Sequence, residues 1–109
     1  MKGISFFRRE SVVQKRHDDP QILVYRSHAA RAITEERWSV AEIFLDRILS
    51  VDPNHTEAWL MKGYLRQHCK EDEEAAAICY RKVLSLCGSE SEHPHAEKAR
   101  ISLGRLVTV

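Results

Sequence analysis

The chain has 109 residues, of which 43% are hydrophobic and 30% charged, and its formal net charge is +1. This length accommodates one compact domain or a short array of repeats, and the balanced charge excludes a strong field that would attract nucleic acid. Only four glycines and three prolines are present, which argues against a disordered or low-complexity chain.

Three cysteines, Cys69, Cys79 and Cys87, are odd in number and form no CxxC pair. The sequence therefore predicts neither a disulfide framework nor a zinc knuckle. The apolar run from Ile4 to Phe7 is much shorter than the hydrophobic region of a signal peptide. No stretch approaches the ~20 apolar residues of a membrane span. We therefore expect reduced thiols, a cytoplasmic location and no stable membrane insertion.

The first expected helix covers residues 4–17, with Phe6, Phe7, Val12 and Val13 as its apolar side chains. Basic residues are interspersed with these apolar ones. Such a basic amphipathic helix either packs on the next helix as a terminal cap or lies on a membrane or an acidic partner. We favour the cap and keep the second surface as an alternative.

An Asp-Pro dipeptide occurs at 19–20 and again at 52–53. Between the two, apolar residues at spacings of three and four predict one helix over about 21–35 and a second that begins at Trp38. Proline lacks a backbone N–H and disfavours helical geometry in the residue before it. The second helix is therefore expected to end near Asp52.

A third pattern predicts a helix from Thr56, whose hydroxyl can cap it, to about Cys69. An acidic cluster at 71–74 suits the positive N-terminal end of another helix, and Gly88 suits the left-handed geometry that ends helices. Pro94 is typical of the first position of a last helix. The expected fold is all-α, with about six helices and no strand.

These helices carry a repeated pattern that resembles the tetratricopeptide-repeat (TPR) family, which places Trp, Leu, Gly and Tyr on one helix and Ala, an aromatic residue and Pro on and after the next. One extra residue separates Gly63 from Tyr80 relative to the family, and Gly88 replaces the closing proline. The residues that carry the resemblance are Ala41, Leu45, Pro53, Trp59, Gly63, Ala76 and Tyr80.

The resemblance implies a short right-handed α-solenoid of helix-turn-helix repeats, in which small residues such as Gly63 let helices approach closely and Trp59 and Tyr80 fill the space beside them. The alternative is an unrelated helical bundle with fortuitous placement of Trp and Gly. The implied units are an N-terminal helix or eroded half repeat, two TPR-like repeats and a C-terminal capping helix, over 1–20, 21–55, 56–90 and 91–109 respectively.

In this family the first helices of successive repeats line a concave groove that binds a partner. The apolar residues of such a groove would supply affinity and the basic ones would orient a bound peptide; the alternative is that each residue is only solvated. The residues to which the resemblance gives this position are Arg26, Ala30, Ile33, Leu60, Tyr64, Gln67, His68, Lys98, Ile101 and Arg105.

The expected function is therefore a protein-interaction module, serving as an adaptor, a scaffold or a small chaperone. A clamp for the C-terminal carboxylates of chaperones is not expected, because Ala30 and Met61 stand where its asparagines would be. The alternative function is a self-assembling structural protein whose repeats form a homo-oligomer.

Enzymatic and metal sites lack support in the sequence. His93, His95 and Cys87 lie close together but without the regular spacing of a zinc site. The acidic run 71–74 is more typical of a solvated helix start than of a general acid and base pair, and no Gly-rich phosphate loop occurs. We expect no enzyme activity, no cofactor and no metal.

Overall fold

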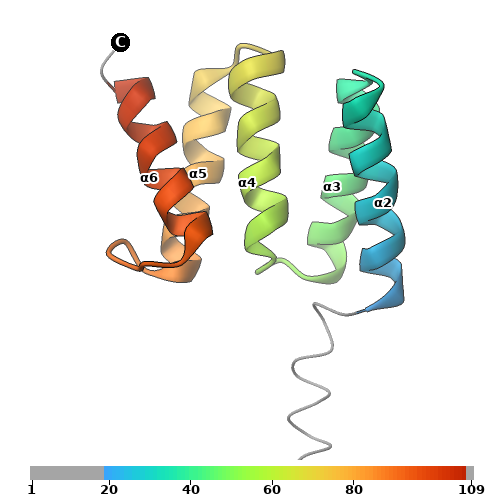
Figure 1. Ribbon diagram of the computed structural model, residues 1–109, viewed down its shortest axis with the longest axis horizontal. Coiled ribbons are helices and arrows are strands. Elements are labelled where there is room, and N and C mark those ends of the chain that lie inside the picture. The colour runs from blue at the N-terminus through green and yellow to red at the C-terminus, as the bar shows by residue number, and fades with distance from the viewer. Residues whose placement is uncertain (1–18, 108–109) are drawn as a thin grey trace, which may run out of the picture.

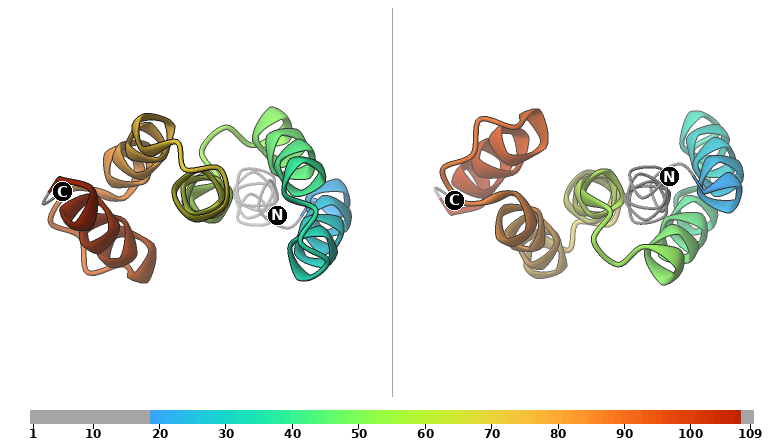
Figure 2. Two further views of the ribbon diagram at one scale, coloured as in Figure 1. Left: turned by 90° about the horizontal axis from the view of Figure 1, so that it is seen from above. Right: turned by 90° about the horizontal axis from the view of Figure 1, so that it is seen from below.

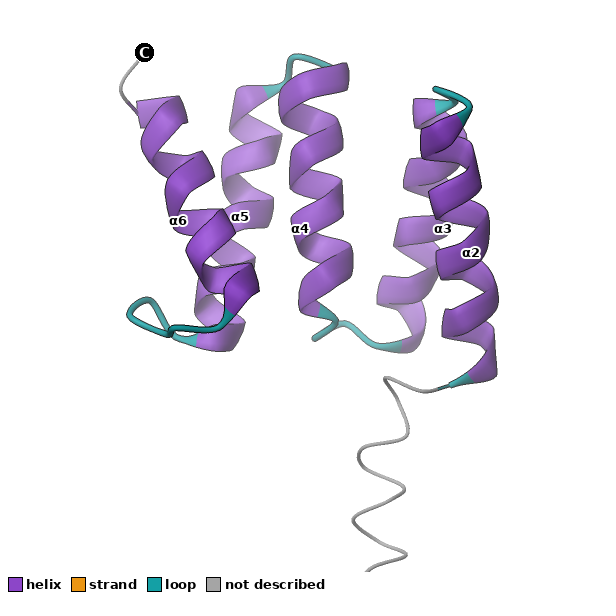
Figure 3. Ribbon diagram, in the orientation of Figure 1, coloured by secondary structure: helices purple, strands orange, loops and turns teal. Residues whose placement is uncertain are grey.

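The computed structural model describes residues 19–107 (Figure 1). The expected helix over 4–17 lies outside the described residues. Within them the prediction of an all-α fold is confirmed, because short loops join helices and no strand is present (Figure 3). None of these helices is long and apolar enough to cross a membrane. They are α2 (Pro20–Thr34), α3 (Trp38–Val51), α4 (Thr56–Tyr64), α5 (Glu73–Cys87) and α6 (Pro94–Val107).

The helices pack mainly on their neighbours in the chain. Helix α2 packs against α3, and α5 packs against both α4 and α6, whereas α2 and α4 approach each other less closely. Seen end-on, α3 and α5 lie on one side, and α2, α4 and α6 lie on the other with α4 set back between them (Figure 2). This arrangement makes two layers and leaves one side of the molecule concave.

Helix ends follow the signals in the sequence at most positions. The Asp19 carboxylate accepts a hydrogen bond of 2.8 Å from the backbone N–H of Gln21 at the start of α2. The Asp72 carboxylate accepts one of 3.1 Å from Ala75 at the start of α5. Gly88 ends α5 with a φ of 97°. As expected, polar side chains accept hydrogen bonds from the free backbone N–H groups at the helix starts, and a glycine with positive φ ends α5.

The cap of α4 differs from the prediction. His55, and not Thr56, precedes the first turn, and its Nδ1 atom accepts a hydrogen bond of 3.1 Å from the N–H of Ala58. The hydroxyl of Thr56 instead pairs with Nδ1 of His95 at 2.9 Å. An imidazole nitrogen is as able to accept as a hydroxyl oxygen, so a histidine one residue earlier takes over the capping role.

The helices α2 and α3 are joined by a turn of the same kind as the one that joins α4, through its continuation, to α5. Glu36 between α2 and α3 has a φ of 58°, and Glu71 between α4 and α5 has a φ of 53°. The two residues are 35 apart in the sequence. Positive φ is uncommon for a residue with a side chain. The turn within α2–α3 and the turn within α4–α5 therefore share one geometry, and we call these two helix pairs the two units.

Helix α4 continues as a π-helical turn over Leu65–Cys69. Corresponding residues are 34 apart before this turn, as for Ala29 and Gly63, and 35 apart after it, as for Ala41 and Ala76. A π turn contains one more residue per hydrogen-bonded ring than an α turn. It therefore accommodates the extra residue of the second unit without displacing the helix that follows.

The core consists of two clusters of buried side chains. The first lies between α2 and α3 and receives Ala58 and Leu65 from α4 and its π turn. The second joins α4, α5 and α6. Trp59 is only half-buried beside it, and its indole N–H donates a 2.8 Å hydrogen bond to the Pro53 carbonyl. Among the residues that carry the resemblance, five are buried as expected: Ala41, Leu45, Gly63, Ala76 and Tyr80.

A ladder of ion pairs joins α3 to α4. Lys62 lies 2.7 Å from the Asp46 carboxylate, and Arg66 and Lys70 lie 2.6 and 3.3 Å from that of Glu42. The Glu42 side chain is only 9% exposed. The acidic residues are four apart on one helix and the basic residues four apart on the other, so each set occupies a single helix face. These pairs hold the two units side by side.

Candidate functional site

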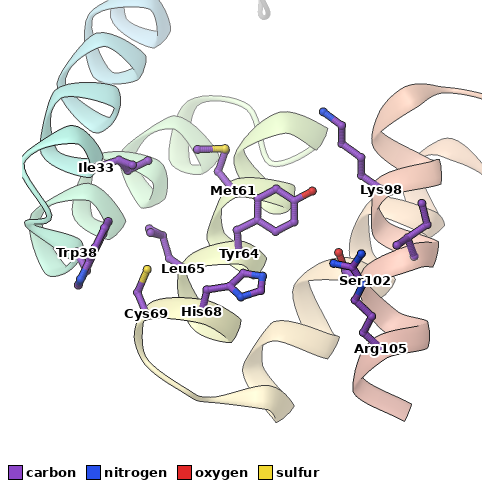
Figure 4. A pocket seen from close by; sticks show the side chains of 11 residues that line it. Ile33, Trp38, Met61, Tyr64, Leu65, His68, Cys69, Lys98, Ser102 and Arg105 are labelled. Carbon is purple, nitrogen blue, oxygen red and sulfur yellow. The ribbon is translucent and has the colours of Figure 1, made fainter. Parts of the chain in front are cut away.

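The concave side contains a hollow of about 520 Å³, which we call the groove (Figure 4). The end of α2 and the start of α3 form one wall, α6 forms the opposite wall, and α4 with its π turn forms the floor. Its volume is within the range of about 300–1,000 Å³ that is typical of ligand sites. The lining residues are Ile33, Trp38, Met61, Tyr64, Leu65, His68, Cys69, Lys98, Ile101, Ser102 and Arg105.

The floor of the groove is mostly apolar. Met61, Leu65 and Cys69 recur every four residues along α4 and its π turn, and all three line the hollow. The π turn also brings His68 to the groove. Sequence reasoning missed the three apolar residues as lining residues, although their spacing of four is visible in the sequence. It followed the positions implied by the family resemblance instead.

The α6 wall carries positive charge. Lys98, Ile101 and Arg105 are spaced by three and four residues, so they share one face of α6, and all three line the groove. Figure 4 shows Lys98 and Arg105 on this wall. Lys98 is exposed and forms no ion pair with any described residue. No Asp or Glu occurs among the described residues that line the groove. The groove therefore combines an apolar floor with a cationic wall.

Tyr64 stands in the middle of the floor and is supported from behind. Its ring meets that of Tyr80 edge to face, with centroids 6.0 Å apart. The Tyr80 hydroxyl donates a 2.6 Å hydrogen bond to Oε1 of Gln67. Burial raises the pKa of Tyr80 to about 12, although the hydroxyl of Ser102 opposes that shift. Tyr80 therefore remains a protonated donor at neutral pH and holds the floor in place.

The structure brings six of the ten predicted groove residues together: Ile33, Tyr64, His68, Lys98, Ile101 and Arg105. Two others do not line the groove. Leu60 is 3% exposed in the core cluster shared with Tyr80, and Gln67 accepts the hydrogen bond from that tyrosine. Leu60 and Gln67 are seven residues apart and so share a helix face. That face of α4 is turned toward α5, which corrects their predicted position.

Arg26 and Ala30 line a second hollow of about 200 Å³ between α2 and α4, which adjoins the groove because both contain Ile33 and Met61. The guanidinium of Arg26 makes two contacts with Glu57, of 2.7 Å from Nε to Oε1 and 2.9 Å from Nη2 to Oε2. Such a two-pronged contact is the strong geometry for Arg and a carboxylate. Arg26 therefore links α2 to α4, and its expected role as a partner contact stays a prediction.

The histidine and cysteine residues considered for a metal have other contacts. Nδ1 of His93 accepts a hydrogen bond of 3.0 Å from the N–H of His95, and Cys87 packs against the second core cluster. Burial raises the pKa of Cys79, which keeps it as a neutral thiol. Within residues 19–107, no group of three His, Cys, Asp or Glu side chains is arranged to hold a metal ion.

Comparisons with protein-family models, with curated proteins and with solved structures found no match to this chain. Its function is therefore inferred from the groove.

Proposed function

We propose that this protein is a TPR-like interaction module that binds a peptide segment of a partner protein in the groove. The observation that carries the proposal is a concave, mainly apolar surface that faces solvent between α2, α3, α4 and α6 and has cations along one wall. Apolar patches of this kind mark interaction sites in soluble proteins. Such a module would act as an adaptor, a scaffold or a small chaperone.

Membership of a right-handed TPR solenoid is part of this proposal. It is supported by the matching turns at Glu36 and Glu71. It is also supported by the burial of small residues at equivalent positions, Ala41 and Ala76, each 0% exposed. Helices stacked in this way place their first members along one concave side, which is where the groove lies.

The composition of the groove favours a peptide over a small polar substrate. Trp38, Met61 and Tyr64 belong to the residue types that are enriched at the cores of protein interfaces. Aromatic anchors of this kind supply much of the binding energy in such interfaces, and surrounding polar residues set orientation. Lys98 and His68 occupy such surrounding positions at the groove.

Selection from a random peptide library tests this function. Ile101→Glu places a charge inside the groove, and Ile78→Glu is a matched control on α5, outside the groove; these isoleucines are 49% and 61% exposed. We expect peptides to be enriched on the parent and on the Ile78→Glu variant, and lost on the Ile101→Glu variant. Equal enrichment on all three proteins would contradict binding in the groove.

A second candidate function is self-assembly, because four large apolar side chains are half-exposed outside the groove. Light scattering over a concentration series separates the two functions. A mass that rises with concentration would support assembly, and a persistent monomer would remove it. The four residues are Leu23, Val24, Ile43 and Ile78.

A further inference from the structure

We infer that the partner segment is an acidic amphipathic peptide, with apolar side chains for the floor of the groove and Asp or Glu carboxylates for the α6 wall. This inference rests on the proposed function. It specifies the charge of the bound peptide, which the shape of the groove alone does not determine.

The lining of the groove gives the first argument. Lys98 and Arg105 stand on its α6 wall, and no carboxylate of the described residues lines it. A bound segment would exclude water from Lys98, which forms no ion pair with any described residue. The cost of that desolvation is offset only when the ligand supplies negative charge or hydrogen-bond acceptors. An acidic peptide does this, and a basic peptide would add repulsion between like charges.

Three carboxylates on the neighbouring helices α3 and α4 are engaged in other ion pairs. Glu57 is held by Arg26 across α2 and α4. On α3, Asp46 is held by Lys62 of α4, and Glu42 is held by basic residues within and just after the π turn. None of these pairs includes Lys98, which forms no ion pair within the described part of the chain. Lys98 is therefore not neutralised by these neighbouring helices.

The spacing along α6 gives the second argument. Lys98 and Arg105 are seven residues apart, which corresponds to about 10 Å along a helix. Ile101 lies between them and faces the same groove. A matching ligand therefore places a carboxylate at Lys98 and an apolar side chain at Ile101, one helical turn away.

The test uses a random library of displayed peptides of about 15 residues, which is four helical turns. The library is selected on the parent protein, on Lys98→Glu and on Arg81→Glu. Arg81 is an exposed arginine on α5, outside the groove, and serves as the control for charge reversal. We expect the parent and Arg81→Glu to enrich peptides with apolar residues and net negative charge. Lys98→Glu should enrich peptides with fewer acidic residues.

Synthetic copies of the enriched peptides provide the quantitative measurement. Lys98→Glu removes one charged contact and puts a like charge in its place, so it should raise the dissociation constant at least about tenfold. Arg81→Glu should change the dissociation constant less than about twofold. Binding to the parent protein should also weaken as salt rises from about 0.05 to 0.5 M, since salt screens the charges. This salt dependence needs no variant, so it tests the inference even if Lys98→Glu folds poorly.

The outcomes separate the two proposals. If the enriched peptides are neutral or basic and Ile101→Glu abolishes their binding, the groove binds peptides and the inferred acidity is wrong. If Ile101→Glu has no effect on any enriched peptide, the proposed function fails, and the inference fails with it. Acidic peptides whose binding depends on both Ile101 and Lys98 would support both.

Discussion

A Cβ atom added to Gly63 would lie 2.6 Å from Cε1 of Tyr80, nearer than Cβ atoms approach other heavy atoms in real structures. The Tyr80 ring is 0% exposed and carries the hydrogen bond that supports the groove floor. The absence of a side chain at Gly63 is therefore what allows α4 and α5 to pack so closely. Neither partner can move without disturbing the core.

Gly63→Ala should consequently lower the free energy of unfolding by about 1–3 kcal/mol, the usual effect of an overpacked core. Gly104→Ala is the matched control, because it also lies in a helix and its added Cβ would meet nothing within 4 Å. That control should stabilise the protein by about 0.5–1 kcal/mol through helix propensity. Urea denaturation measures both, and similar effects of the two substitutions would contradict the close contact.

Glu71→Gly should raise the free energy of unfolding by about 0.5–1 kcal/mol, because glycine adopts positive φ without steric strain. Glu36→Gly should have the same effect, since the two turns match. The control is Glu35→Gly, at a residue whose φ is −87°, and it should destabilise the protein. Thermal melts followed by circular dichroism decide the outcome. Destabilisation at both Glu36 and Glu71 would mean that their conformation carries no strain.

Glu42→Gln should destabilise the protein by about 3 kcal/mol, because it leaves Arg66 and Lys70 without their partly buried anion. Asp46→Asn is the control. Its carboxylate is 54% exposed, and exposed ion pairs contribute only about 0–1 kcal/mol. Denaturant titration of the two variants should rank them in this order. The reverse order would show that the junction of the two units does not depend on Glu42.

Stability should fall as the pH is lowered from 7.5 toward 5.5. Burial lowers the pKa of His95, as do the neighbouring His93 and Lys98, so the unfolded chain binds a proton that the folded chain does not. Such a group contributes stability that is fully present above its unfolded-state pKa of about 6.5 and is lost as the pH falls from this value through the lower pKa of the folded state. Melting temperatures should therefore decrease over this range.

His95→Gln should flatten the pH profile, because the group that titrates is removed. His28→Gln serves as the control, since that histidine is exposed on α2 and stacks on Phe44. A profile that keeps its slope in His95→Gln would assign the pH dependence to another residue.

The sequence predicted the helices well, because their ends are marked by local chemistry. Asp19, Asp72 and Gly88 act within one turn of their own positions, so a short stretch contains the whole signal. The exception at the start of α4 is also local, since His55 and Thr56 both offer an acceptor and only the fold decides between them. The repeat pattern also placed Ala41 and Leu45 of α3 and Ala76 and Tyr80 of α5 between the helices, and all four are buried.

The groove was predicted less completely because the orientation of a helix depends on what packs against it. Leu60 and Tyr64 are one turn apart, yet Tyr80 and its neighbours cover the first and leave the second beside the groove. The π turn after Tyr64 changes the rotation of the residues that follow. No local sequence pattern predicts this π turn. Only the extra residue between Gly63 and Tyr80 pointed to an irregularity.

Amide chemical-shift changes on adding a library-selected peptide test peptide binding in the groove most directly. We expect the largest changes at residues of the floor and the α6 wall, such as Met61, Tyr64, His68, Lys98 and Ile101. Residues around Ile43 and Ile78, on the layer formed by α3 and α5, should change little. Changes confined to that layer, or no changes at saturating peptide, would contradict the assignment of the groove as the binding site.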